Sequence, residues 1–243
     1  MKIPFEIKGQ LNKLYPFRTE LHAHTTPASF CSEIQPEKLV EIYVEKGYDA
    51  LVLTNHFSKD VLSCKNKKSD IDNWLCDYDR CVEAAKGTRL RVILGAEVRF
   101  SENTNDYLIY GVNEEILSVC YDYFDKGVEK YREEVRLEKS LFIKAHPYRN
   151  GITPTSSNLL DGVEAYNMHP GHNSRIGLAC RYANENPDFI VTAGSDFHHL
   201  NKGHEGLCAL RTKEVPNDTF ELVSILKSRD YVLEIGEDSI ILP

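Results

Sequence analysis

The feature of this sequence that most constrains its fold is a repeated alternation of short apolar runs with longer amphipathic stretches. The segment ALVLT (50–54) has the length and composition of a buried strand, and the segment 36–47 before it places apolar residues on one face of a helix. Pro36 suits the first turn of that helix and Gly47 its end. This alternation predicts repeated strand–helix units and an α/β fold.

The same pattern continues along the rest of the chain. The further elements that we expect are helices over about 70–86, 125–139, 174–184 and 217–228, and strands over 90–100, 107–111, 141–146, 162–167 and 189–194. The sequence has no internal repeat and no linker-like change of composition. A length of 243 residues therefore favours a single domain covering residues 1–243.

Composition excludes several classes of protein. Hydrophobic residues make up 42% of the chain, too many for a disordered protein. No apolar run approaches the roughly 18 residues of a membrane span, and the first ten residues lack the apolar core of a signal peptide. The net charge of −8 argues against an extended nucleic-acid partner. Seven scattered cysteines without a CxxC pair suit free thiols, so we expect a cytoplasmic protein without membrane association; its oligomeric state is left open.

Side chains that commonly bind metal ions stand at the ends of successive predicted strands. In folds built from strand–helix units, the carboxyl ends of the strands form one face, so residues far apart in sequence meet there. We therefore expect these side chains to converge on one site. They are His22, His24, His56, Glu97, His146, Asp196 and His198.

The spacing and chemistry of this set favour a metal cluster. His22 and His24 are two residues apart, so on a strand their side chains point to the same side, and Asp196 and His198 repeat that spacing. Imidazoles mixed with carboxylates suit zinc, manganese or iron better than magnesium or calcium. Taken alone, Asp196 could cap a helix and Glu97 could be an exposed strand residue. The ordered set nevertheless predicts a site for two or three divalent metal ions.

Other catalytic motifs are missing from the sequence. It has no phosphate-binding loop of the GxxxxGK[ST] type and no GxGxxG after a strand. Ser195 lies in AGSDF, which is not a GxSxG nucleophile elbow, and there is no HExxH pair. These absences argue against nucleotide-binding, serine-hydrolase and zinc-protease chemistry of those kinds.

The segments that carry the candidate ligands together resemble the PHP (polymerase and histidinol phosphatase) domain. The resemblance covers about residues 18–200, with the motifs in family order. It implies a distorted seven-stranded βα barrel, (β/α)7, with a site for up to three metal ions at the C-terminal ends of the strands, and phosphoester hydrolysis. The matching segments are LHAHT (21–25), LVLTNH (51–56), GAE (95–97), AHPYR (145–149), VEAYN (163–167) and GSDFH (194–198).

The resemblance also implies how the ligands are shared among the ions. Glu97 would bridge two of the three. The three implied ligand sets are His22, His24, Glu97 and Asp196 for one ion, Glu97 with His146 for a second, and His56 with His198 for the third.

Three positions depart from the family pattern. Asp106 stands where the family often has a histidine, and Cys31 stands nearest to another expected histidine or aspartate. Both are candidate ligands, although Asp106 could instead be a turn residue and Cys31 a small buried thiol. Asn55 replaces the aspartate of the family's TDH motif, which affects hydrogen bonding around the ligands more than ligation.

The phosphoester hydrolysis that the resemblance implies would follow from the metal ions. A metal-bound water that loses its proton near neutral pH would attack phosphorus, while the ions hold the other phosphate oxygens. Arg149 and Arg175 are candidates for binding the phosphate, although either could be a surface ion pair. The expected substrate is a small phosphorylated metabolite or nucleotide. The alternatives are a histidinol-phosphate phosphatase and a non-catalytic metal-bound module that binds a ligand or partner.

Overall fold

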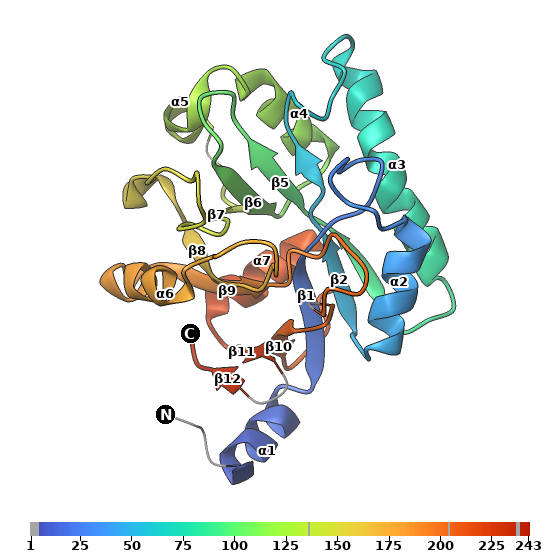
Figure 1. Cartoon of the computed structure of the whole chain (residues 1–243), viewed down its shortest axis with the longest axis vertical. Coiled ribbons are helices and arrows are strands. Elements are labelled where there is room, and N and C mark those ends of the chain that lie inside the picture. Colours follow the sequence, from blue (N-terminus) through green and yellow to red (C-terminus); the bar gives the residue numbers. More distant parts are fainter. Residues whose placement is uncertain (1–4, 136, 204, 237–238) are drawn as a thin grey trace.

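The computed structural model describes residues 5–135, 137–203, 205–236 and 239–243. Its strands pair into two six-stranded sheets, each with parallel and antiparallel neighbours (Figure 1). In spatial order, the first sheet contains β12 (Ser239–Ile241), β11 (Val232–Ile235), β10 (Cys208–Thr212), β1 (Phe17–Ala23), β2 (Ala50–Leu53) and β4 (Arg91–Leu94). The second contains β3 (His56–Phe57), β5 (Ala96–Arg99), β6 (Asp106–Tyr110), β7 (Leu141–Lys144), β8 (Gly162–Asn167) and β9 (Ile190–Gly194).

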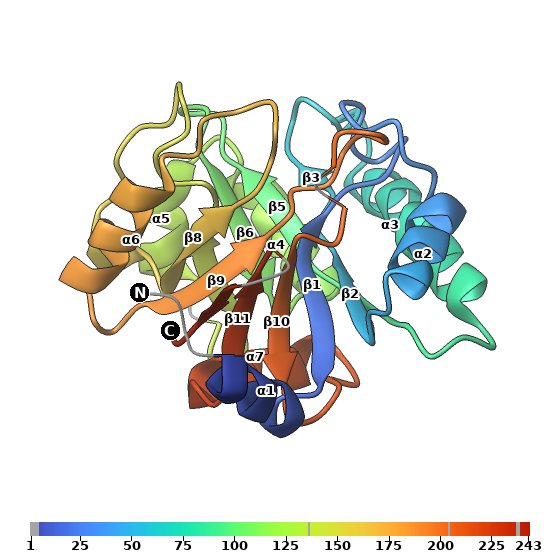
Figure 2. The same cartoon turned by 60° about the horizontal axis from the view of Figure 1, so that its bottom comes forward.

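The helices lie around the outside of the two sheets. Helices α2 and α3 lie side by side next to β2 and β4, α6 packs on β8, and α1 lies at the periphery (Figures 1 and 2). The helix bounds are α1 (Phe5–Leu14), α2 (Pro36–Glu45), α3 (Lys67–Ala85), α4 (Glu114–Tyr123), α5 (Gly127–Glu134), α6 (Ile176–Glu185) and α7 (Thr219–Ser228).

The expected α/β class is confirmed, but the strands of the described residues do not close into one hydrogen-bonded ring. The predicted strand 90–100 is divided at Gly95, where the chain passes from β4 in the first sheet to β5 in the second. Gly95 N–H donates to the carbonyl of Leu53 (2.9 Å), and a Cβ at Gly95 would lie 2.8 Å from the Val52 side chain. The seven-stranded barrel stays a prediction.

The two sheets also meet along a seam between β1 and β9. Among the described residues, Ala23 and Phe197 form the one β-bridge there. Backbone hydrogen bonds run from Asp196 N–H to the carbonyl of His22 (2.9 Å) and from His24 N–H to the carbonyl of Phe197 (3.0 Å). The buried carboxylate of Glu20 also accepts the N–H of His22 (3.0 Å) and of Ser195 (3.1 Å). These contacts bring the end of β1 close to the end of β9.

The region after β6 differs from the sequence prediction. One helix was expected near 125–139, but the structure has α4 and α5. Asn113 starts α4, because its side-chain oxygen accepts the N–H of Ile116 (2.9 Å). Gly127 has a φ of +83°, which separates the two helices.

Buried apolar side chains from both sheets form the interior between them, including Leu21 and Val52 from the first sheet and Leu108 and Ile143 from the second. All seven cysteines are free thiols, as predicted. Within the described ranges, no helix is both long and apolar enough to cross a membrane.

Candidate metal centre

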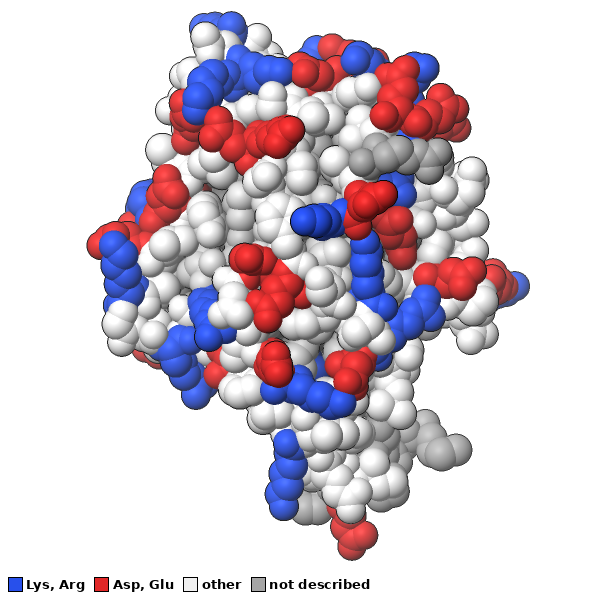
Figure 3. All heavy atoms as spheres, turned by 180° about the vertical axis from the view of Figure 1, so that it is seen from behind, with Lys and Arg blue, Asp and Glu red and all other residues white. Residues whose placement is uncertain are grey.

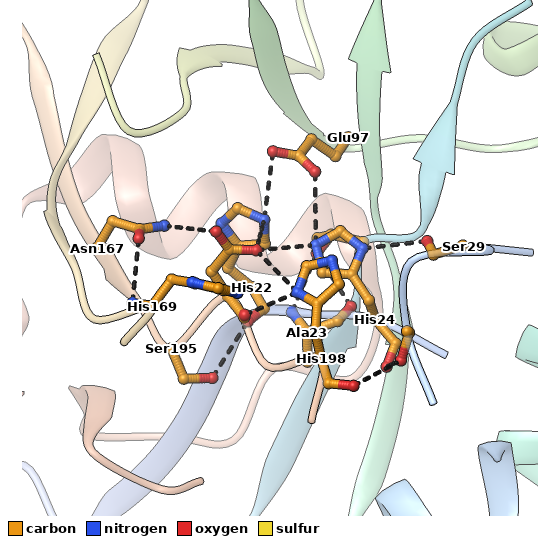
Figure 4. A network of polar contacts seen from close by, with 12 residues as sticks. His22, Ala23, His24, Ser29, Glu97, Asn167, His169, Ser195 and His198 are labelled. Atoms are coloured by element: carbon orange, nitrogen blue, oxygen red, sulfur yellow. Dashed lines mark hydrogen bonds and ion pairs between the residues drawn. The ribbon is translucent and has the colours of Figure 1, made fainter. Parts of the chain in front are cut away.

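Ligand-type side chains from both sheets converge at one end of the strands (Figure 4). His22 and His24 lie on β1 and Glu97 on β5, while His146 and Asp196 follow the ends of β7 and β9 by two residues. The structure thus brings together the residues that the sequence analysis placed at successive strand ends. Among the described residues, three groups have ligand atoms within 4.8 Å of one another: His24, His56 and His198; His22, His24 and Asp196; and His56, Glu97 and Asp106.

Glu97 occupies the middle of the cluster. Its Oε1 lies 3.0 Å from Nε2 of His146 and 3.4 Å from Nε2 of His22. Its Oε2 lies 2.8 Å from Nδ1 of His56 and 3.4 Å from Nε2 of His24. Each carboxylate oxygen therefore lies between two imidazoles, an arrangement that suits a carboxylate bridging two ions.

Asp196 faces the same imidazoles from the opposite strand. Its Oδ1 lies 3.4 Å from Nε2 of His22 and 3.3 Å from Nε2 of His24. The same oxygen lies 3.3 Å from Nδ1 of His198. The other oxygen, Oδ2, accepts a hydrogen bond from Arg149 (3.2 Å). One face of this carboxylate is thus turned to the imidazoles and the other to a guanidinium.

Several buried imidazole nitrogens of the cluster lack a hydrogen-bond partner among the described residues. They are Nε2 of His22, Nε2 of His24 and Nδ1 of His146. Buried polar atoms are nearly always satisfied, and an imidazole nitrogen without a partner is a ready metal ligand. The residues present therefore fit divalent metal ions.

A second set of side chains orients these ligands. Glu164 on β8 lies 2.7 Å from Nδ1 of His22, and its other oxygen accepts the N–H of His146 (3.0 Å). Ser29 donates its hydroxyl to Asn55 (3.1 Å), which leaves its oxygen to accept from Nδ1 of His24 (3.1 Å). Both histidines thereby turn Nε2 toward the cluster.

The role of Asn55 agrees with the expectation that it acts around the ligands, whereas the sequence analysis missed Glu164. A signal was present. Glu164 interrupts the apolar strand VEAYN, and a buried acid in such a strand needs a partner.

Charges within the cluster shift the pKa values of its groups. Burial alone would lower the pKa of His22, but the carboxylates of Glu164 and Asp196 outweigh it and hold that pKa well above its usual value. Burial, together with the neighbouring His198, holds the pKa of His24 well below its usual value. Without metal, a proton on His22 therefore balances part of the carboxylate charge.

The backbone is strained at two of the converging residues. His146 has a φ of 27° and Asp196 a φ of 52°, in the left-handed region that residues with a Cβ rarely adopt. Each stands two residues beyond a strand end, where this turn aims the side chain back over the cluster. Strain of this kind concentrates at functional sites.

Two of the three departures from the family pattern, Asp106 and Cys31, are candidate ligands and lie next to the cluster. Asp106 is buried, and Arg99 donates to it from Nε (2.7 Å) and Nη2 (2.9 Å). Cys31 is an exposed residue, but its thiol is turned toward the imidazoles of His56 and His198. Partial burial of the thiol raises its pKa, whereas the two neighbouring imidazoles lower it. The imidazoles have the larger effect, and the pKa of Cys31 falls to about 6.

A cavity of about 280 Å³ opens over the cluster. Arg149 lines it, but Arg175 does not, because the guanidinium of Arg175 is bound to the carbonyl of Tyr148 (2.9 Å) and to Asn150 (2.6 Å). This position does not favour the phosphate-binding role predicted for Arg175. The lining consists of Phe30, Cys31, His56, Ser58, Asp60, Val61, Arg99, Asp106, Arg149, His169, His172, His198 and His199.

Comparison with known families and structures agrees with this geometry. The family model of the PHP domain matches residues 20–237. The chain belongs to the PHP domain family. No curated protein matches this PHP-domain chain at a significant level.

Two solved structures resemble the fold. One is a two-domain protein from Bacteroides vulgatus containing a predicted PHP-like metal-dependent phosphoesterase, with 14% identity and a TM-score of 0.58; the match covers 91% of this chain and 65% of that one. The other, from Bifidobacterium adolescentis, is provisionally assigned as a metal-dependent phosphoesterase, with 15% identity and a TM-score of 0.50; the match covers 86% of this chain and 95% of that one. At these identities the likeness concerns the fold.

Proposed function

We propose that this PHP-domain protein is a metal-dependent phosphoesterase that hydrolyses a small phosphorylated metabolite or nucleotide. The observation that carries the proposal is the cluster of buried imidazoles and carboxylates at the floor of an open cavity. The unpartnered Nε2 atoms of His22 and His24 face the oxygens of Glu97 and Asp196, as metal ligands would. We expect two or three divalent ions of zinc, manganese or iron, including a third ion at His56 and His198.

The side chains around the cluster have separate tasks in this proposal. Ions bound there would polarise a phosphoryl oxygen and lower the pKa of water. Glu164 orients His22, and Ser29 orients His24. Arg149 lines the cavity while its Nη1 is anchored on Asp196, so its remaining donors are available to a phosphate oxygen.

Cavity size and surface charge favour a small substrate. A volume of about 280 Å³ suits one phosphate with a modest organic group. On the face seen from behind, lysine and arginine side chains are interspersed with acidic ones, so this face has no continuous basic surface (Figure 3). The net charge of −8 argues against an extended nucleic acid for the chain as a whole. We also keep the cytoplasmic location as a prediction.

The test is a hydrolysis screen with protein loaded with Mn²⁺ or Zn²⁺. Nucleotides, sugar phosphates and histidinol phosphate form the panel, and released phosphate is measured. We expect turnover of at least one compound. Asp196→Asn should lower kcat/KM by more than about a hundredfold, because a metal ligand matters at least as much as the residues that orient ligands.

Asp79→Asn is the matched control, since Asp79 is exposed on α3 outside the cavity. It should keep wild-type activity. Metal-loaded protein that hydrolyses nothing in the panel would favour a non-catalytic metal-bound module, and selective turnover of histidinol phosphate would favour the histidinol-phosphate phosphatase.

A further inference from the structure

Arg99 occupies a position in the cavity that the sequence analysis did not single out. It lies on β5 two residues after Glu97, so the two side chains leave the strand on the same face. Arg99 lines the same cavity as Arg149. The cavity therefore carries two guanidinium groups above a floor of candidate metal ligands.

The two arginines are anchored in the same manner. Arg149 donates from Nη1 to Asp196, and Arg99 donates from Nε and Nη2 to Asp106. Each guanidinium is thus fixed on a carboxylate of the metal-ligand groups. A fixed guanidinium loses little conformational entropy when it binds a further anion.

Arg99 retains a donor that its anchor does not use. The hydrogen bonds to Asp106 come from Nε and Nη2 and not from Nη1, which lies 3.9 Å from a carboxylate oxygen of Asp60. The Asp60 side chain is 68% exposed, so that ion pair is weak and easily displaced. Nη1 is therefore available to an anion entering the cavity.

We propose that Arg99 is a substrate-binding residue that, together with Arg149, makes the site selective for phosphate monoesters over diesters. This inference rests on the proposed phosphoesterase function. A monoester presents three non-bridging oxygens and two negative charges, whereas a diester presents two such oxygens and one charge. Two guanidiniums in addition to the metal ions match the monoester, because each can bind an oxygen that the ions leave unoccupied.

A simpler role is possible for Arg99, because it neutralises Asp106 and could act only by positioning that carboxylate. The two roles differ in their consequences. A positioning residue would change metal content when replaced, whereas a substrate-binding residue would change phosphate affinity with the metal in place.

The experiment measures inorganic phosphate binding by calorimetry on protein loaded with Mn²⁺. It also measures hydrolysis of p-nitrophenyl phosphate and of bis(p-nitrophenyl) phosphate. We expect Arg99→Ala to weaken phosphate binding and monoester kcat/KM by about ten- to a hundredfold. Diester kcat/KM should change by less than about threefold, and metal content by elemental analysis should not change.

Two further variants keep the test decisive. Arg99→Lys preserves a positive partner for Asp106 but loses the planar fork, so it should retain metal and recover only part of the phosphate affinity. If Arg99→Ala fails to fold, Arg99→Lys carries the test. Arg181→Ala is the control, because Arg181 is exposed on α6, pairs with the nearby Glu185 and does not line the cavity.

Three results would overturn the inference: unchanged phosphate affinity in Arg99→Ala and Arg99→Lys, loss of metal in proportion to loss of binding, or equal losses on monoester and diester. Phosphate binding is measured without turnover, so it separates this inference from the proposed function. A protein that binds phosphate through Arg99 but hydrolyses no ester would refute the phosphoesterase and leave Arg99 as an anion-binding residue.

Discussion

The carboxylate of Glu164 lies 2.7 Å from Nδ1 of His22, and both side chains are fully buried. Because Glu164 holds Nδ1, the other ring nitrogen of His22 faces Glu97 and Asp196. A carboxylate that fixes an imidazole in this way also increases its basicity as a ligand. Glu164 is therefore expected to control metal affinity without touching the metal.

Replacement of Glu164 by glutamine tests this relationship. Glu164→Gln keeps the size of the side chain and removes its charge, so we expect metal affinity to fall by about ten- to a hundredfold. Competition with a chelator measures the change. Glu115→Gln, at an exposed position on α4, should leave the affinity as it is. Equal affinities in the two variants would refute the role of Glu164.

The raised pKa of His22 predicts opposite pH dependences for the stability of the metal-free protein and for the strength of metal binding. In the metal-free protein, protonated His22 contributes stability that is complete below the unfolded-state pKa of about 6.5. That contribution is lost as pH rises through the raised folded-state pKa. A metal ion needs the neutral imidazole, so metal binding releases a proton and strengthens as pH rises.

We therefore expect the gain in Tm on metal loading to be larger at pH 8 than at pH 6. Thermal unfolding of loaded and chelator-treated protein at both pH values measures it. Calorimetry in buffers of different ionisation enthalpy should also detect the released proton. A gain in Tm that is the same at both pH values would contradict this prediction.

The low pKa of Cys31 predicts selective alkylation of its thiol. With a pKa of about 6, most of the thiol is ionised at pH 7, whereas an ordinary cysteine is only a few per cent thiolate. We expect iodoacetamide to modify Cys31 on the order of tenfold faster than the exposed Cys64 and Cys76, as measured by peptide mass spectrometry. Metal loading should slow only Cys31, and an unchanged rate would argue against a metal ion beside it.

Gly194 should tolerate no side chain. A Cβ at this position would lie 2.4 Å from Cβ of His22 and 2.5 Å from Oε1 of Glu164. Gly194→Ala should therefore lower the free energy of unfolding by about 1–3 kcal/mol and reduce metal content. Gly177→Ala on α6 meets no atom within 4 Å, so it should leave stability unchanged or raise it by up to about 1 kcal/mol. Urea unfolding and elemental analysis compare the two.

The sequence predicted which residues meet, because ligand types at strand ends converge in any fold of strand–helix units. His22 and Asp196 could be brought together on that basis without knowing the exact sheet topology. The division of the strand at Gly95 was not predictable from periodicity, because the apolar run continues through it. The division depends on the close packing of Gly95 against Val52, which leaves no space for a side chain at position 95.

Partners across strands were the hardest part of the site to predict. Arg99 and Asp106 meet because β5 and β6 pair antiparallel in the register that places them opposite each other. Neither residue carries a signal of that register in its own segment. Arg175 shows the converse: the sequence analysis named it as a candidate for binding phosphate, but the loop conformation directs its guanidinium to the carbonyl of Tyr148.

Because the two sheets meet at the seam between β1 and β9, a metal ion bound in the candidate centre would join one sheet to the other. His22 belongs to the first sheet and Glu97 to the second, and the two sheets meet at this seam through one β-bridge, a few backbone hydrogen bonds and the contacts of Glu20. An ion bound to both ligands would act as a cross-link that exists only in the folded chain. Loaded protein should then unfold at a higher temperature than chelator-treated protein, because the unfolded chain cannot hold both ligands on the same ion.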